Sequence, residues 1–139
     1  MKGIKVFTGL AALTFMLSIS MHIFAQSTTI IVDTKASTLN WKGEKVTGNH
    51  VGTIKIKSGE LVSTGSSLTG GTIVIDMSSI VCTDLNNEDY NAKLISHLES
   101  EDFFYVEKHP TASSEISKVE SIGDNKVKIS GNMTIRGNT

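Results

Sequence analysis

Proline and cysteine are nearly absent from this chain of 139 residues, where each occurs once, as Pro110 and Cys82. A single Cys excludes an internal disulfide, and the lack of proline and of excess charge excludes the composition of a disordered chain. The chain also lacks an excess of charge of either sign, because its 13 basic and 14 acidic residues leave a net charge of −1. Without a basic excess, we expect no nucleic-acid partner. The length is enough for one small domain.

Catalytic and metal-binding motifs are also missing. The glycine-rich stretch at residues 65–71 has no Lys for a phosphate loop, and neither Gly-x-Ser-x-Gly nor His-Glu-x-x-His occurs. His50, His97 and His109 lie 47 and 12 residues apart, which matches no metal-ligand pattern. The sequence neighbours of Cys82 include no His or cation, so we expect a small buried side chain near a strand end. These absences predict a non-catalytic protein with no metal and no cofactor.

A stretch of apolar and small residues without charge lies near the N-terminus, at residues 6–24, after Lys2 and Lys5. Because a small residue, Ala25, follows it, we predict a secretory signal peptide at residues 1–25, cleaved before Gln26. A membrane anchor is the alternative, but polar residues interrupt the run and no basic cluster follows it. We therefore expect a periplasmic or secreted domain at residues 26–139 that meets a membrane only transiently. That domain carries 11 basic and 14 acidic residues.

Serine and threonine, by contrast, are abundant, with 32 residues between them. About seven runs alternate apolar and polar residues, which predicts half-buried antiparallel strands in a sandwich or barrel. Residues 54–57 and 60–63 are expected to form two strands joined by a turn at Ser58 and Gly59. A bulge or a sharp bend is expected at Gly70 and Gly71.

One stretch, residues 84–103, departs from the alternation. Tyr90, Leu94 and Leu98 are spaced as one face of a helix of about three turns. The candidates for its N-cap are Asp84, Asn86 and Asn87. The aromatic run that follows, at residues 103–105, is expected either to seal one end of the core or to contact a ligand.

His50 stands between Gly48 and Gly52 at the head of a predicted strand, and the two glycines allow a close approach of the backbone. Two interpretations remain open for it. It either fills a gap in a turn, or points inward and forms a hydrogen bond with a polar group of a ligand.

Five segments, taken in order, resemble the YceI-like family of exported, lipocalin-like proteins that bind polyisoprenoids. The most specific is residues 97–110, which is similar to the family pattern Leu-x-Ser-x-Asp-Phe-Phe-x-Val-x-x-x-Pro. The others are residues 41–43, 48–54, 71–80 and 131–137.

This resemblance implies an all-β fold, an eight-stranded antiparallel barrel with a helix near one opening. It also implies an elongated apolar interior that holds an isoprenoid chain, such as a quinone tail or a polyprenyl phosphate, for transport, storage or stress protection. The side chains expected to line that interior are Trp41, His50, Ile54, Ile56, Ile73, Ile75, Met77, Leu94, Leu98, Phe103, Phe104, Ile129 and Met133.

Two departures from the family pattern stand out. Tyr90-Asn91-Ala92-Lys93 lacks the Arg of the family's Arg-Asp-x-His-Leu, so an Arg role in holding a head group would fall to Lys93. The family domain also continues beyond the strand at residues 131–137, so we expect a truncated barrel with an exposed edge that favours dimers or edge-to-edge association. The alternatives are a β-sandwich interaction domain without a ligand and a small metal-dependent hydrolase that uses His50 and His97.

Overall fold

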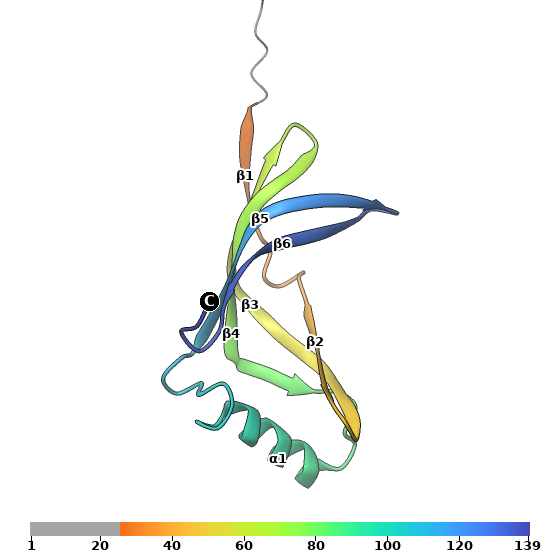
Figure 1. Ribbon diagram of the computed structural model, residues 1–139, viewed down its shortest axis with the longest axis vertical. Coiled ribbons are helices and arrows are strands. Elements are labelled where there is room, and N and C mark those ends of the chain that lie inside the picture. The colour runs from red at the N-terminus through yellow and green to blue at the C-terminus, as the bar shows by residue number, and fades with distance from the viewer. Residues whose placement is uncertain (1–25) are drawn as a thin grey trace, which may run out of the picture.

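The computed structural model describes residues 26–139, which form six strands and one helix (Figure 1). The predicted signal peptide lies outside the described residues. The elements are β1 (Ser27–Ile31), β2 (Leu39–Lys45), β3 (Gly48–Thr64), β4 (Ser67–Cys82), α1 (Glu88–Glu99), β5 (Thr111–Gly123) and β6 (Lys126–Thr134).

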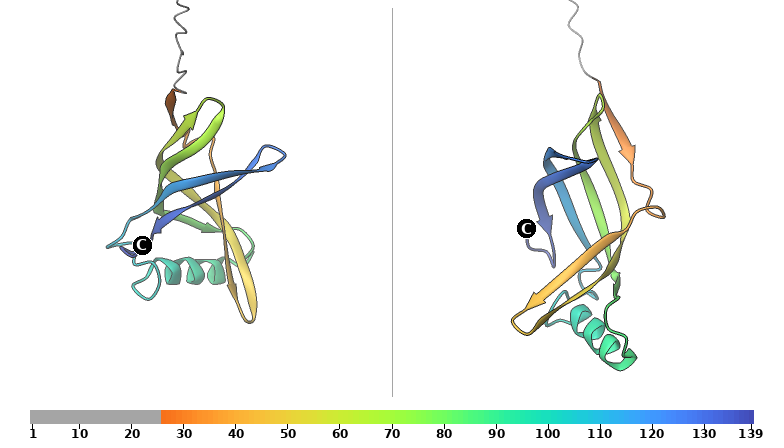
Figure 2. Two further views of the ribbon diagram at one scale, coloured as in Figure 1. Left: turned by 45° about the horizontal axis from the view of Figure 1, so that its top comes forward. Right: turned by 90° about the vertical axis from the view of Figure 1, so that its right-hand side faces the viewer.

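All six strands belong to one antiparallel sheet in the order β1-β3-β4-β5-β6, and β2 also pairs with β3. β1 and β2 share one edge of β3, since Ser27 lies opposite Thr64 and Lys45 lies opposite Gly48. The strands twist strongly, and α1 lies across the lower end of the sheet (Figure 2). The prediction of an antiparallel, barrel-like all-β fold is confirmed. Within residues 26–139 the sheet does not close, and the sandwich alternative is wrong because there is no second sheet.

β3 differs from the prediction of two short strands joined by a turn. It runs for 17 residues without a break, and Ser58 and Gly59 pair with Val74 and Ile73 of β4. A register shift between Ile56 and Ser58 marks an irregularity in the pairing instead. A serine and a glycine are typical of a turn locally, but here the neighbouring strands hold them in extended backbone.

The bulge predicted near Gly70 and Gly71 is confirmed. The pairing of β3 with β4 shifts register between Val62 and Ser63, and Val62 lies opposite Gly70. Gly71 has φ +150°, and a Cβ there would lie 2.4 Å from the carbonyl oxygen of Glu60. Only glycine allows the two backbones to approach this closely.

Helix α1 has the predicted length of about three turns but a different buried face. Asn87 is its N-cap, with the side-chain oxygen accepting a 3.0 Å hydrogen bond from the Tyr90 N–H. Leu98 is buried and Leu94 packs against the core, whereas Tyr90 is 63% exposed, so its assignment to the buried face is wrong. Ile95 packs against the core instead of Tyr90. No helix within residues 26–139 is both long and apolar enough to cross a membrane.

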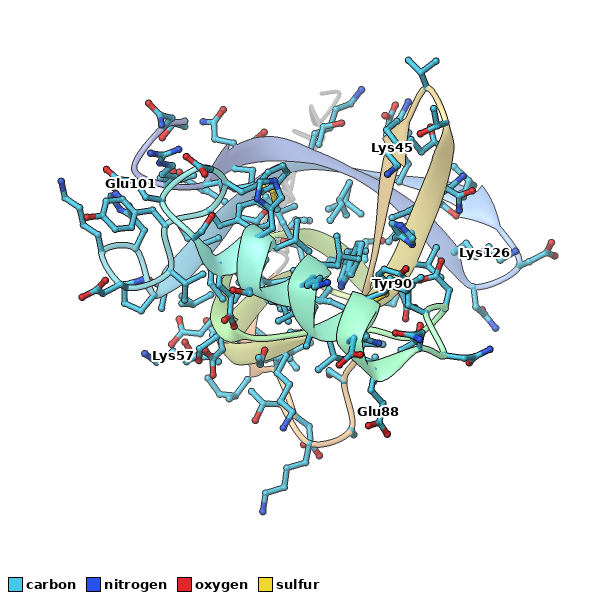
Figure 3. The ribbon with its side chains drawn as sticks, turned by 90° about the horizontal axis from the view of Figure 1, so that it is seen from below. Lys45, Lys57, Glu88, Tyr90, Glu101 and Lys126 are labelled. Carbon is cyan, nitrogen blue, oxygen red and sulfur yellow. The ribbon has the colours of Figure 1, made fainter. Side chains whose placement is uncertain are left out.

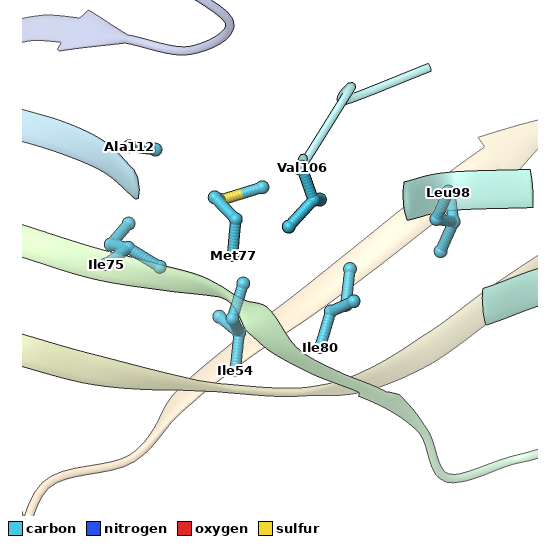
Figure 4. Packing of buried hydrophobic residues seen from close by; sticks show 7 residues of the cluster. All are labelled: Ile54, Ile75, Met77, Ile80, Leu98, Val106 and Ala112. Carbon is cyan, nitrogen blue, oxygen red and sulfur yellow. The ribbon is translucent and has the colours of Figure 1, made fainter. Parts of the chain in front are cut away.

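The main core lies where β3, β4 and β5 meet α1 (Figure 4). It is thin for a domain of this size, since even its least exposed member, Ala112, keeps 3% of its surface. Its other members are Ile54, Ile75, Met77, Ile80, Leu98 and Val106. A curved sheet that is not closed leaves one side of such a cluster without a packing partner.

Candidate functional site

An apolar pocket of about 290 Å³ opens beside this core. It lies between the concave face of the sheet and the C-terminal end of α1 with the loop that follows. Lys42 is its one charged lining residue, and its Nζ forms an ion pair with Glu44 rather than standing free. The other lining residues are Trp41, Gly43, Ile54, Ile75, Met77, Ile80, Leu98, Phe103, Phe104, Ala112 and Ile135.

A second pocket of about 310 Å³ adjoins the first and shares Trp41, Gly43, Leu98 and Phe103 with it. It is more polar, because the β2–β3 hairpin and α1 add charged and imidazole side chains. Figure 3 shows this end of the molecule, with α1 in front and Lys45 near the tip of the hairpin. The additional lining residues are Glu44, Lys45, His50, Leu94 and His97. Together the two pockets form an apolar groove with a polar end.

The aromatic run after α1 closes one side of this groove. Backbone hydrogen bonds from Phe104 N–H to Leu98 O (3.0 Å) and from Val106 N–H to Glu99 O (2.9 Å) fold the loop back onto the helix. Phe103 and Phe104 then meet edge to face, with ring centroids 4.6 Å apart. Both rings line the first pocket, so the aromatic run contacts the pocket as well as sealing the core.

Trp41 forms the opposite side of the groove, and its position depends on a glycine. Its indole Nε1–H donates a 3.0 Å hydrogen bond to the carbonyl oxygen of Val81. A Cβ at Gly52 would lie 2.7 Å from the indole ring and 1.9 Å from that same oxygen. The Gly-x-x-x-Gly segment around His50 therefore provides the close backbone approach that the sequence predicted, at Gly52.

His50 itself contacts a carboxylate of the same chain. Its Nδ1 lies 3.2 Å from Asp84 Oδ2, and the Cys82 Sγ–H donates to Asp84 Oδ1 at 2.9 Å. Asp84 Oδ1 also accepts a 3.2 Å hydrogen bond from the Val51 N–H. The Cys82 hydrogen bond, helped by those of Val51 and His50, holds the pKa of the Asp84 carboxyl below its usual range, against the opposing effect of burial.

Most of the residues predicted to line the interior do meet at the groove. Ile73 packs beside the core without lining either pocket, and Ile56 is buried outside the main cluster. Ile129 and Met133 of β6 lie outside both pockets, and each keeps close to half of its surface exposed. Those on the groove are Trp41, His50, Ile54, Ile75, Met77, Leu94, Leu98, Phe103 and Phe104.

The sequence reasoning missed several residues of this region. Ile80, Ala112 and Ile135 line the first pocket. Ile135 continues the alternation of Val127, Ile129 and Met133, and this pattern was the signal that could have identified it. Cys82 and Asp84 were judged by their sequence neighbours, whereas their partner His50 lies more than 30 residues away.

Two residues were predicted to have roles other than lining the interior: Lys93 in holding a head group and His97 in a metal site. Lys93 lines neither pocket; its Nζ lies 5.7 Å from the centroid of the Tyr90 ring. His97 lines the second pocket with His50, but it is not part of the group formed by His50, Cys82 and Asp84. The pairing of His50 with His97 in a metal site stays a prediction.

A comparison with known protein families matches residues 31–139 to the YceI-like domain. The chain belongs to this family, which confirms the resemblance seen in the sequence. Membership supports the general class of lipid-binding and polyisoprenoid-binding proteins, which are generally not enzymes. No curated protein matches the chain.

Proposed function

We propose that the groove between the sheet and α1 holds the isoprenoid chain of a lipid. The observation that carries this proposal is the first pocket, in which eleven of the twelve lining residues carry no charge. The first pocket has a volume of about 290 Å³ and the adjoining pocket about 310 Å³. Each volume is near the lower end of the range for ligand sites in proteins. Membership of the YceI-like family supports the same ligand class.

The affinity would come from burial of the hydrocarbon. Each buried methylene contributes roughly 0.8 kcal/mol, whereas association costs about 4–15 kcal/mol. A few prenyl units would then offset the cost of binding without any polar contact. This accounts for an apolar groove that offers few hydrogen-bonding groups.

The polar end of the groove is the proposed place of the lipid head group. Lys45, His50 and His97 line the second pocket and provide hydrogen-bond donors for a phosphate or a quinone carbonyl. Glu44 lines the same pocket, which limits the positive charge there. The chain of the lipid would extend from this end past Trp41 and Phe103 into the first pocket.

A pocket-filling variant tests the proposal. Ile135 lines the first pocket and is only partly buried, so Ile135→Trp places added bulk in the pocket rather than in the core. We expect the amount of polyprenyl lipid extracted with the purified protein, measured by mass spectrometry, to fall at least fivefold. Binding of added polyprenol should fall in parallel.

Ile122→Trp is the matched control, since it makes the same change at a position on β5 that is 62% exposed. It should keep the wild-type amount of lipid. Wild-type protein that carries no lipid and takes up no added polyprenol would contradict the proposal, as would equal lipid in both variants.

We also propose that the protein is exported, so that it meets its lipid outside the cytoplasm. The support is the sequence of residues 1–25, with two Lys residues before an uncharged run and Ala25 at its end. Mass spectrometry of protein from the periplasmic or secreted fraction should show Gln26 at the N-terminus. An uncleaved chain in the cytoplasmic fraction would contradict this.

A further inference from the structure

We propose that His50, Cys82 and Asp84 form a binding site for a thiophilic divalent cation such as Zn²⁺. One ligand atom from each of these side chains lies within 4.8 Å of the other two. The site shares His50 with the second pocket, whereas Cys82 and Asp84 line neither pocket, so metal binding can be tested without any lipid.

The three side chains provide a donor set that zinc prefers. Thiolate sulfur, imidazole nitrogen and carboxylate oxygen bind Zn²⁺ at about 2.3, 2.0–2.1 and 2.0–2.2 Å. A tetrahedral site with those bond lengths separates its ligand atoms by roughly 3.3–3.6 Å. The distances of 3.2 Å from His50 Nδ1 to Asp84 Oδ2 and 2.9 Å from Cys82 Sγ to Asp84 Oδ1 are shorter than that separation, and they run to the two different oxygens of one carboxylate. A cation would therefore require the three side chains to move slightly apart.

Without a cation, Asp84 forms hydrogen bonds with His50 and Cys82. A bound cation would replace these two hydrogen bonds by metal–ligand bonds. The Cys82 thiol releases its proton to solvent and binds as a thiolate, and His50 binds as neutral imidazole through a nitrogen lone pair. Asp84 binds as the carboxylate, the form that its lowered pKa already favours. Three protein ligands leave a fourth position for water, as in the open class of zinc sites.

The backbone around the three residues is held in place from two directions. Val51 accepts a 2.9 Å hydrogen bond from the Thr83 N–H, which fixes the Cys82–Asp84 segment to the strand that carries His50. From α1, the Asn91 Nδ2–H₂ group donates to the carbonyl oxygens of Cys82 and Leu85, both at 3.0 Å. These bonds fix the backbone that carries the three ligand side chains.

The experiment uses the purified, reduced chain and metal ions alone. Co²⁺ should give a near-ultraviolet sulfur-to-cobalt charge-transfer band and the visible bands of four-coordinate cobalt, saturating at one ion per chain. Zn²⁺ should displace it, and bound Zn²⁺ should slow the reaction of Cys82 with a thiol reagent at least tenfold. Wild-type protein with no charge-transfer band overturns the proposal, whatever the variants do.

The variants separate this site from adventitious binding. Cys82→Ser should abolish the charge-transfer band, and His50→Ala and Asp84→Asn should each lower Zn²⁺ affinity at least tenfold. His109→Ala is the matched control, since it removes an imidazole that belongs neither to this group nor to the second pocket, and its Zn²⁺ affinity should stay at the wild-type level. Zn²⁺ affinity that survives both His50→Ala and Asp84→Asn places the ion elsewhere and overturns the proposal. Circular dichroism checks that each variant is folded.

Discussion

At the scale of the residue, Gly52 determines whether the wall of the groove can form. Its missing side chain allows the Trp41 indole and the Val81 carbonyl to lie against the β3 backbone. The sequence indicated close approach somewhere in the segment around His50. That Gly52 and not Gly48 provides it depends on Trp41 and Val81, which come from two other strands.

Substitution of Gly52 should therefore destabilise the protein strongly. In Gly52→Ala the new Cβ would lie 1.9 Å from the Val81 carbonyl oxygen, and backbone atoms of paired strands cannot easily move away. We expect a loss of about 1–3 kcal/mol in the free energy of unfolding, measured by urea denaturation. Gly43→Ala is the control, because its Cβ would meet only the Trp41 ring at an ordinary 3.7 Å. Equal losses in the two variants would contradict this account.

The hydrogen bonds of Asp84 predict how stability depends on pH. A carboxyl whose pKa is lowered by folding stabilises the protein above its unfolded pKa of about 3.9. That contribution is lost as the pH falls through the lower value of the folded state. The gap in urea midpoint between wild type and Asp84→Asn should therefore be present at pH 6 and shrink toward pH 2. Asp102→Asn removes a carboxyl outside this group, and a gap with the same pH dependence in that variant would contradict the assignment.

At the scale of the element, α1 shows which features of a helix can be predicted from local sequence and which cannot. Its position and length follow from local sequence, because helix propensity acts within a few residues. The sequence offers Asn87 as one of three cap candidates, with Asp84 and Asn86, and the structure selects it. The buried face of the helix does not follow from local sequence, because Tyr90 fits the helical periodicity as well as Ile95 does. The packing against β4 and the aromatic loop selects Leu94, Ile95 and Leu98 and turns Tyr90 to solvent.

The cap itself can be tested. Asn87→Ala removes the acceptor for the Tyr90 N–H and should lower the free energy of unfolding by about 1 kcal/mol, measured by urea denaturation. Asn86→Ala changes the exposed neighbour and should have little effect. A larger loss at Asn86 would mean that the helix begins elsewhere.

At the scale of the whole molecule, the sheet leaves apolar residues of β6 exposed. Val127 and Ile129 are each 48% exposed, and β6 pairs with β5 alone within residues 26–139. An unpaired strand edge beside apolar side chains favours association. We therefore expect the purified chain to associate with itself as its concentration rises.

Ile129→Lys should weaken this association, because a charge would have to be buried at the contact. Sedimentation velocity over a range of concentrations should show the average mass shifting toward the monomer. Ser130→Lys adds the same charge to the adjacent position of β6 and should have a smaller effect, since alternate residues point to opposite faces. A wild-type chain that stays monomeric throughout would contradict the prediction.

The sequence by itself determined the strand-rich composition, the helix near residues 88–99 and the family resemblance, because these depend on neighbours in the chain. The tertiary structure decided the rest. It made β3 continuous through Ser58 and Gly59, where paired strands override a turn-forming dipeptide. It also brought His50 to Cys82 and Asp84 across more than 30 residues. Strand register and sheet curvature are set by contacts between distant segments, and a local pattern holds no information about which segments will meet.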